Sequence, residues 1–258
     1  MLKSVAMSFA LLLGYSVSLC AAPLQLYTEE YAPVSFSRAG KAAGMATEVV
    51  EEILRRQGQA ANIQVVPWAR GYQTVLRTPD SALFATIRST EREASFQWVG
   101  PILQTHDGFY ALKGSGLVIR TQAELAAAGQ IAVPRDWFTF QELTANGMPN
   151  LLGVSEPIQM FKMLRRGRIK LILADNLSFF SRGDAASQVD YLTAKDVEVV
   201  LPYRTSYGYI AFWHGTDAQT LERWQTTLDT MKADGSFAAI YQRWLPGETP
   251  PPLREPVR

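Results

Sequence analysis

The sequence predicts an α/β protein made of two successive β/α series. Short apolar or alternating runs typical of strands alternate along the chain with longer segments whose apolar residues recur at helical spacing. The chain has 258 residues, of which 47% are hydrophobic and 19% are charged. This is ordinary globular composition, and the length suffices for one large domain or for two lobes. The alternation favours mostly parallel sheets that are covered by helices.

The first series begins with a short alternating run at residue 24. Its predicted strands are residues 24–27, 62–66 and 82–87. One helix is predicted over residues 46–57, with Gly58 as its stop. A second helix carries its apolar face at Tyr72, Val75 and Leu76.

The second series follows a turn at residues 113–116. Its predicted helices are 121–128, a short helix or turn at 141–145, and 157–166. An extended run at 108–112 is predicted before this turn, strands at 130–133, 169–174 and 197–200 after it, and a last long extended run at 207–213. Two final helices have apolar stripes at Leu221, Trp224, Leu228 and Met231, and at Phe237, Ile240, Tyr241 and Trp244. The proline-rich segment 247–258 is predicted to be disordered.

The composition argues against several classes of function. The formal net charge is +1, whereas nucleic-acid-binding domains usually carry a clear basic excess, so we expect no nucleic-acid partner. His106 and His214 are the only histidines and Cys20 is the only cysteine, and they form no group with metal-ligand spacing. The sequence contains no glycine-rich phosphate loop and no Gly-x-Ser-x-Gly motif. We therefore predict neither a metal site nor a cofactor.

Residues 1–22 have the pattern of a cleaved secretory signal. Lys3 supplies the positive start, residues 5–19 form the apolar core, and small residues follow. An apolar stretch of about 15 residues is too short for a comfortable membrane span, which needs about 20. Lipidation of Cys20 is the alternative, but Leu19 does not fit the small residue expected before a lipidated cysteine. We therefore expect a periplasmic protein without a lipid anchor.

Six segments follow one another in an order and spacing that extend over most of the chain. They are Tyr31-Ala32-Pro33, Ser89-Thr90-Glu91-Arg92, Trp98-Val99-Gly100-Pro101, Gly167 through Asp175, Tyr207-Gly208-Tyr209-Ile210-Ala211, and Asp234-Gly235-Ser236 through Trp244. Together they resemble the solute-binding proteins of bacterial ABC importers, in the amino-acid-binding group called family 3.

This resemblance implies a type II periplasmic binding protein fold, in which two α/β lobes are joined by two hinge crossings. Lobe 1 would combine residues 23–110 and 206–246, and lobe 2 would be residues 111–205. A ligand would bind between the lobes, and hinge closure would trap it. The resemblance also implies a monomer that delivers its ligand to an ABC permease in the inner membrane. The turn at residues 134–139 departs from the family's Gly-Thr-Thr-like turn, which leaves the identity of the ligand open.

Arg92 is the strongest candidate for a ligand contact. Its planar guanidinium fits a carboxylate through two parallel hydrogen bonds. It follows a strand predicted to end at Ile87, and ligands gather beyond the carboxyl ends of strands in α/β sheets. Ser89, on the same turn, is a further candidate. The alternatives are a surface arginine paired with a neighbouring glutamate, and a helix-capping role for Ser89.

Asp175 is the candidate for the opposite charge. It directly follows the apolar run Leu171-Ile172-Leu173-Ala174. Burying a carboxylate without a partner costs several kcal/mol, and a ligand ammonium would provide a partner. The alternative is a capping role for the segment that starts at Leu177.

The remaining candidates are aromatic or basic. Tyr31, Trp68 and Trp137 could contact flat, apolar or cationic groups of a ligand, with core packing as the alternative. Arg70 and Arg88 are candidate anion contacts. The alternative is a salt bridge for Arg70 and, for Arg88, a structural pairing with Glu48 or Asp107.

Three functions remain open at this stage. The first is capture of a small polar, amino-acid-like solute for ABC import. The second is an enzyme on the same fold that resembles cyclohexadienyl dehydratases, for which Glu29, Glu30 or Glu156 could serve as the general acid. The third is a ligand-loaded partner of a signalling receptor. Our main hypothesis is the binding protein, without enzymatic activity.

Overall fold

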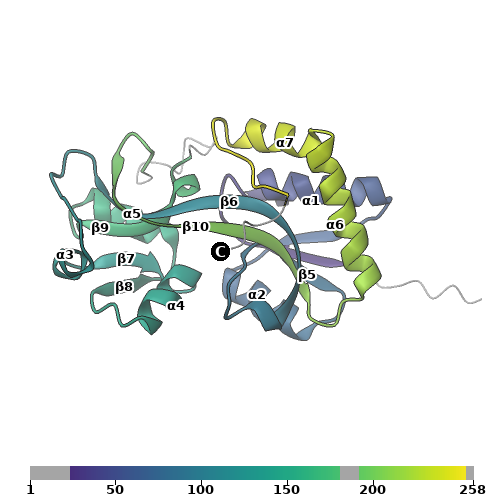
Figure 1. Cartoon of the computed structure of the whole chain (residues 1–258), viewed down its shortest axis with the longest axis horizontal. Coiled ribbons are helices and arrows are strands. Elements are labelled where there is room, and N and C mark those ends of the chain that lie inside the picture. Colours follow the sequence, from purple (N-terminus) through teal and green to yellow (C-terminus); the bar gives the residue numbers. More distant parts are fainter. Residues whose placement is uncertain (1–23, 181–191, 254–258) are drawn as a thin grey trace, which may run out of the picture.

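Two strands of seventeen residues each, β6 (Phe96–Leu112) and β10 (Val197–Trp213), cross the molecule and join its two lobes (Figure 1). The structure is a computed structural model that describes residues 24–180 and 192–253. All but two of its strands form one eight-stranded sheet in the order β4-β1-β5-β10-β6-β9-β7-β8. This arrangement agrees with the two lobes and two crossings that the sequence resemblance implied.

Lobe 1 is a parallel sheet with helices on both faces. Its elements before the crossing are β1 (Gln25–Thr28), β2 (Phe36–Arg38), β3 (Lys41–Ala43), α1 (Met45–Gln57), β4 (Asn62–Val65), α2 (Trp68–Arg77), β5 (Ser81–Ile87) and the 3-10 turn η1 (Glu93–Ser95). Two helices from the end of the chain complete it, α6 (Ala218–Ala233) and α7 (Ser236–Trp244). Helices α1, α6 and α7 cover one face around the fully buried Trp224 and Tyr241, and α2 covers the other.

Lobe 2 repeats this design on a smaller scale. Its elements are α3 (Gln122–Ala127), β7 (Ile131–Pro134), α4 (Phe138–Ala145), β8 (Leu151–Val154), α5 (Pro157–Arg165), β9 (Leu171–Asp175) and the 3-10 turn η2 (Asn176–Phe179). Strands β8, β7 and β9 are parallel. Helix α5 packs on one face through Phe161, and Leu125 and Leu143 of α3 and α4 pack on the other.

Local sequence signals explain where several helices begin and end. Gly58 ends α1 in the left-handed conformation, at φ 63°, which glycine adopts without steric cost. Thr121 and Glu124 form a capping box at the start of α3. Pro157 occupies the first turn of α5, and the carboxylate of Asp217 accepts from the N–H of Thr220 at the start of α6.

The register of β6 and β10 places the ends of the other strands. Strand β5 ends at Ile87 opposite Gly208 of β10. Strand β9 ends at Asp175 opposite Asp107 of β6, and Asp107 is itself opposite Arg204 of β10. Strands β5 and β9 run in opposite directions, so their carboxyl ends approach each other near the middle of the pair formed by β6 and β10.

The long crossing strands are the main difference from the sequence-based expectation. Residues 197–200 and 207–213 were predicted as separate extended runs, and only residues 108–112 of β6 were predicted. The pairing continues through Pro101 and Pro202 because register shifts, or bulges, accommodate positions where proline cannot donate to the ladder. The short strands β2, β3 and β8 were also not predicted.

The segment that follows α7 lies against the fold as far as it is described. The side chain of Asn176 donates to Glu248 at 2.7 Å, Lys232 Nζ donates to the Pro252 carbonyl at 2.7 Å, and Pro251 is buried. The prediction of disorder from residue 247 is therefore wrong for residues 247–253, because tertiary contacts satisfy backbone groups that composition alone leaves unpaired. The predicted signal segment, residues 1–22 with Cys20, lies outside the described residues, and so do residues 254–258. No helix in the described ranges is both long enough and apolar enough to span a bilayer.

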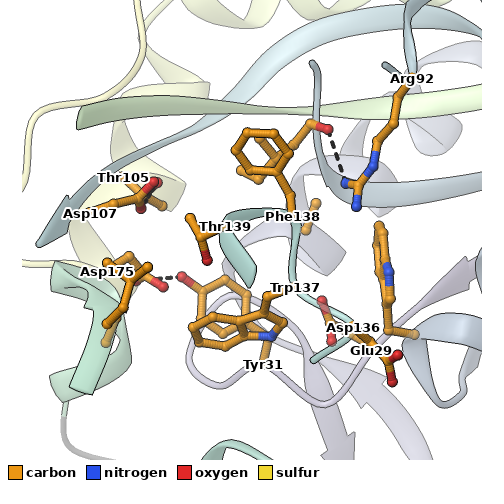
Figure 2. A pocket seen from close by; sticks show the side chains of 15 residues that line it. Glu29, Tyr31, Arg92, Thr105, Asp107, Asp136, Trp137, Phe138, Thr139 and Asp175 are labelled. Carbon is orange, nitrogen blue, oxygen red and sulfur yellow. Dashed lines mark hydrogen bonds between the residues drawn. The ribbon is translucent and has the colours of Figure 1, made fainter. Parts of the chain in front are cut away.

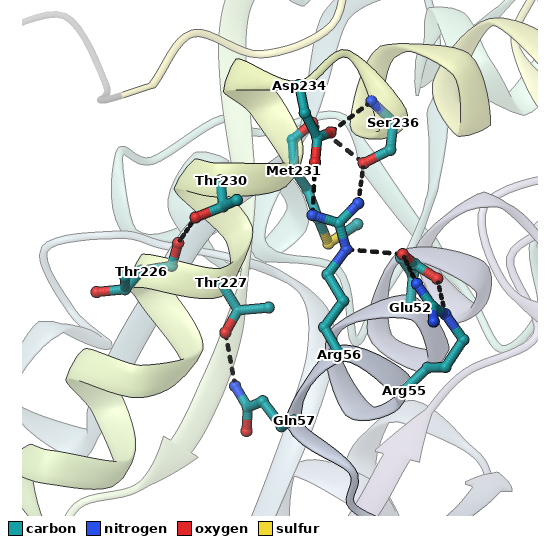
Figure 3. Close-up of polar contacts among 10 residues, drawn as sticks. All are labelled: Glu52, Arg55, Arg56, Gln57, Thr226, Thr227, Thr230, Met231, Asp234 and Ser236. Atoms are coloured by element: carbon teal, nitrogen blue, oxygen red, sulfur yellow. Dashed lines mark hydrogen bonds and ion pairs between the residues drawn. The ribbon is translucent and has the colours of Figure 1, made fainter.

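We expect Arg56 to stabilise lobe 1 (Figure 3). It donates to Glu52 at 2.7 Å, to Asp234 at 2.6 Å and to Ser236 at 2.7 Å, and so joins α1 to the turn between α6 and α7. Urea denaturation of Arg56→Ala should show a loss of about 1 kcal/mol in the free energy of unfolding.

Arg55→Ala is the matched control for this measurement. Arg55 also bonds to Glu52, but its side chain is 70% exposed and joins no second element. We expect no measurable change. An equal loss in both variants would show that the link between α1 and the turn does not matter.

Candidate functional site

A pocket between the lobes collects residues that follow the carboxyl ends of several parallel strands (Figure 2). Its empty space, including the opening to solvent, is about 640 Å³, which is in the range of small-molecule sites. Lobe 1 contributes residues after β1, at the start of α2 and after β5, whereas lobe 2 contributes residues after β7 and at the end of β9. This convergence is the usual position of ligand sites in α/β sheets.

Arg92 is buried in the wall of this pocket, with only 5% of its surface exposed. Its guanidinium carbon lies 5.1 Å from the ring centre of Trp68, 5.5 Å from that of Tyr72 and 5.7 Å from that of Phe138. Its one hydrogen bond in the described chain is to the Ile87 carbonyl, at 3.3 Å, and it forms no ion pair there. Burial lowers the pKa of Arg92, and the aromatic rings attract the cation.

Asp175 and Tyr31 meet across the pocket. The Tyr31 hydroxyl donates to Asp175 Oδ1 at 2.6 Å, and the amides of Leu177 and Ser178 donate to the same oxygen. The Ser178 hydroxyl donates to Oδ2 at 3.0 Å. Asp175 therefore caps η2, the alternative recognised in the sequence, and also lines the pocket. Burial raises the pKa of Asp175, and these hydrogen bonds oppose that rise.

The start of α4 forms the lobe 2 wall. Trp137 lies edge-on to Tyr31, with 6.4 Å between the ring centres. Phe138 and Thr139 begin the helix, so the positive end of its dipole lies at the pocket. The Thr139 hydroxyl is buried and has no hydrogen-bond partner among the described residues. An unsatisfied buried hydroxyl costs free energy, and a polar ligand atom would offset this cost.

Asp107 belongs to strand β6, which connects the lobes, and its carboxylate has three polar neighbours. Ser206 donates to it at 2.6 Å, Thr105 donates to it at 3.2 Å, and Arg204 Nε lies 3.6 Å away. Burial, followed by the nearby charge of Asp175, raises the pKa of Asp107 to about 6. Arg204 offsets part of the charge of Asp107 when it is ionised, but it also forms a shorter ion pair with Glu142, at 2.8 Å, and its guanidinium carbon lies 4.0 Å from the Phe138 ring centre.

Glu29 enters the pocket immediately after β1. Its carbonyl accepts from the Tyr31 amide and the Ser35 hydroxyl, which holds its backbone in place. Its carboxyl group makes no hydrogen bond or ion pair with the described part of the chain. Burial raises the pKa of Glu29 to about 8, and Arg92 opposes this rise. A carboxyl group with this pKa is mostly protonated at neutral pH.

The structure brings together five of the eight residues predicted from sequence. They are Tyr31, Trp68, Arg92, Trp137 and Asp175, and all of them line the pocket.

Ser89, Arg70 and Arg88 do not line the pocket. The Ser89 carbonyl accepts the Arg92 amide, which shapes the turn. Arg70 is exposed on α2. Arg88 forms a double hydrogen bond with Glu93 at 2.6 and 2.8 Å, beside the ring of Trp98. It is therefore salt-bridged, as its alternative supposed, but to Glu93 and not to Glu48 or Asp107, the partners that were expected.

Sequence reasoning did not assign a ligand role to Asp107, Asp136 or Thr139, and considered Glu29 only as a general acid. The rule that identified Arg92, position after a strand, also applies to Glu29 and Asp136. Asp107 lies inside a strand and carries no such signal. Among the described residues, no group of three or more histidine, cysteine, aspartate or glutamate side chains is arranged to hold a metal.

Glu29 should make the stability of the ligand-free protein depend on pH. The folded protein keeps the Glu29 proton up to about pH 8, whereas the unfolded chain releases it near 4.5. This contribution to stability is complete below pH 4.5 and is lost as the pH rises through 8. We expect melting temperatures of Glu29→Gln to fall less than those of the wild type between pH 6 and 8.5. Glu30→Gln, a change at an exposed neighbour, should follow the wild type, and identical profiles for all three proteins would contradict the assignment.

Solved structures with the same fold bind amino acids or act as sensors. One is an ABC uptake transporter substrate-binding protein from Streptococcus pneumoniae with bound histidine, at 13% identity, a TM-score of 0.75, and coverage of 89% of this chain and 95% of that one. A histidine kinase sensor domain gives 18% identity, a TM-score of 0.74, and coverage of 89% and 98%. An ArgBP mutant from T. maritima gives 17% identity, a TM-score of 0.70, and coverage of 86% and 94%. At these identities the likeness establishes the type II periplasmic binding protein fold.

The sequence comparison identifies the family. No curated protein sequence matches the chain. The profile of the bacterial extracellular solute-binding proteins, family 3, matches residues 25–247, which is nearly the whole described region. This agrees with the resemblance seen in the ordered motifs. The chain belongs to the bacterial extracellular solute-binding proteins of family 3.

Proposed function

We propose that this protein captures a small amino-acid-like zwitterion in the periplasm and delivers it to an ABC permease. The observation that carries the proposal is the environment of Arg92, a buried guanidinium at the pocket wall without a carboxylate partner in the described chain. An uncompensated buried charge is costly, and a ligand carboxylate would remove the cost through a bidentate, charge-assisted pair. The Thr139 hydroxyl and the start of α4 would complete the anion site from lobe 2.

The ammonium group of the ligand would bind at Asp175. Asp175 Oδ2 accepts only the Ser178 hydroxyl in the described residues, whereas Oδ1 accepts three donors. Oδ2 therefore has the greater capacity for a further donor. Tyr31 would fix the orientation of the carboxylate and cover one side of the ligand.

Closure of the lobes would follow from this division of contacts. Arg92 and Tyr31 belong to lobe 1, whereas Asp175, Thr139 and Phe138 belong to lobe 2. A ligand that bonds both sets of residues binds the closed form better than the open form, and so shifts the population towards closure. We propose that the protein acts as a monomer, in which the lobes of one chain form the whole site.

Arg92→Ala should weaken binding of the cognate amino acid by roughly 100-fold or more, because truncation leaves the ligand carboxylate buried without its partner. The binding should be measured by titration calorimetry, after a thermal-shift screen of amino and organic acids has found the ligand. A ligand at 100 times its dissociation constant adds about 2.7 kcal/mol to stability, which such a screen detects.

Arg88→Ala is the control for this experiment, because Arg88 pairs with Glu93 outside the pocket. Its affinity should stay within about twofold of the wild type. Unchanged affinity in Arg92→Ala would exclude the proposed carboxylate contact, and failure of every zwitterion in the screen to bind would exclude the proposed function.

A role as the ligand-loaded partner of a signalling receptor is the alternative on the same site. The fold is shared with a histidine kinase sensor domain as well as with an import protein. Neighbouring permease and ATPase genes would favour import, whereas a neighbouring sensor kinase gene would favour signalling.

An enzymatic function is the second candidate, and Glu29 is the observation that favours it. A pocket carboxyl group with a pKa of about 8 is protonated at neutral pH and could act as a general acid. A solved structure with the same fold is an ancestral amino-acid-binding protein, a precursor of cyclohexadienyl dehydratase, at 16% identity and a TM-score of 0.70, covering 86% of this chain and 95% of that one.

Incubation of the protein with arogenate and with prephenate distinguishes the binding function from the enzymatic function. A binding protein should release no phenylalanine or phenylpyruvate above the uncatalysed rate, as followed by chromatography. Turnover by the wild type that disappears in Glu29→Gln and persists in Glu30→Gln would replace the binding function with catalysis.

A further inference from the structure

The charges that line the pocket are unequal. Four carboxyl groups line it, those of Glu29, Asp107, Asp136 and Asp175, and Arg92 is the only cation that does so among the described residues. Arg204, at 3.6 Å, offsets part of the Asp107 charge from outside the lining, and it is shared with Glu142, at 2.8 Å. At least three carboxyl groups therefore face one guanidinium.

A simple zwitterion does not change this imbalance. Its carboxylate would pair with Arg92 and its ammonium with Asp175, which leaves Glu29 and Asp136 without a counter-charge. Asp136 is exposed, so water screens its charge. Glu29 is partly buried, and its carboxyl group has no bonding partner within residues 24–180 and 192–253. A charged Glu29 is therefore costly until a cation reaches it.

The positions of these groups indicate where that cation would lie. Glu29 and Asp136 both line the pocket, and in the view of Figure 2 both lie to the right of Asp175. Trp68 also lines the pocket, and its indole is half-buried next to Arg92. A pocket wall that carries acidic groups and an aromatic face is a favourable environment for an ammonium or guanidinium on an alkyl chain.

We propose that Glu29, supported by Asp136, binds a second cationic group of the ligand, so that the site selects amino-acid-like solutes with a net positive charge. This inference rests on the proposed binding function, and it adds the charge class of the ligand. A basic side chain would reach Glu29 while the amino-acid end binds Arg92 and Asp175. Neutral and acidic amino acids would leave Glu29 unpaired and would bind more weakly.

The affinity for such a ligand should depend on the ionisation of Glu29. Burial raises the pKa of Glu29 to about 8, Arg92 opposes the rise, and the charges of Asp175, Glu156 and Asp136 add to it. The Tyr31 hydroxyl remains neutral because its pKa is raised well above its usual value. Between pH 7 and 8.5 the ionised fraction of Glu29 increases roughly eightfold. A cationic ligand side chain binds the ionised form of Glu29. The affinity for such a ligand should therefore increase as the ionised fraction of Glu29 increases.

The test compares L-arginine with L-citrulline, which has nearly the same shape but a neutral side chain, and L-lysine with L-norleucine. Titration calorimetry at pH 8.5 should show that the wild type prefers the cationic member of at least one pair by about tenfold or more, the usual value of a charge-assisted hydrogen bond. The preference should fall roughly eightfold at pH 7. The two members of each pair have the same α-amino and α-carboxyl groups. The titration of these groups therefore largely cancels in the ratio of the two affinities.

Glu29→Gln keeps the shape of the side chain and removes its charge. We expect it to bind the neutral members at least as tightly as the wild type does, and to lose both the preference and its pH dependence. Glu30→Gln removes an equal charge from the exposed neighbour and should keep both. Should Glu29→Gln fail to fold, the pH dependence of the wild-type preference still decides the question.

The outcomes separate this inference from the function on which it rests. Equal or tighter binding of the neutral members, or a preference that persists in Glu29→Gln, would overturn the role of Glu29 and leave the binding of zwitterions intact. Failure of all four amino acids to bind would overturn the inference, and failure of the wider screen as well would overturn the proposed function.

Discussion

The antiparallel pairing of β6 with β10 is the constraint on which the rest of the structure depends. The parallel strands of each lobe are hydrogen-bonded to this pair, β5 to β10 and β9 to β6. Because the two sets run in opposite directions, their carboxyl ends approach each other at the middle of the pair. The same strands connect the lobes, so the segments that place the site are also the segments that would bend in the proposed closure.

The site combines this geometry with an unusual distribution of charge. Arg92 is surrounded by aromatic rings instead of carboxylates, and Asp175 is held by Tyr31 and by backbone amides. Each ionised group is kept in place by neighbours that do not neutralise it. In the proposed function, a ligand with complementary charges would supply the counter-charges of Arg92 and Asp175. Part of its binding free energy would come from removing the cost of burying these groups without counter-charges. We propose the same for Glu29, a further ionisable group in the pocket whose charge a cationic group of the ligand would neutralise.

The helices and the short parallel strands other than β8 could be predicted from the sequence because their signals are local. Periodic apolar residues, Gly58 and the caps of α3 and α6 act within a few residues of their own position. The long crossing strands could not be predicted, because Pro101 and Pro202 interrupt the local pattern and the bulges that accommodate them depend on the partner strand. The ordered segment 247–253 was missed for a similar reason, since Glu248 bonds to Asn176, 72 residues away.

The sequence by itself determined the family, the order of most elements, and candidate residues at or shortly after the ends of strands, including Arg92, Tyr31 and Asp175. These depend on motif order and on a topological rule that holds for every α/β sheet. Only the tertiary structure decided which charges share the pocket. Arg88 and Arg92 lie on the same turn, yet one pairs with Glu93 and the other faces the cleft. Asp107 and Glu29 join Asp175 only because separate strands converge, and charge balance is a property of groups in space and not of their spacing along the chain.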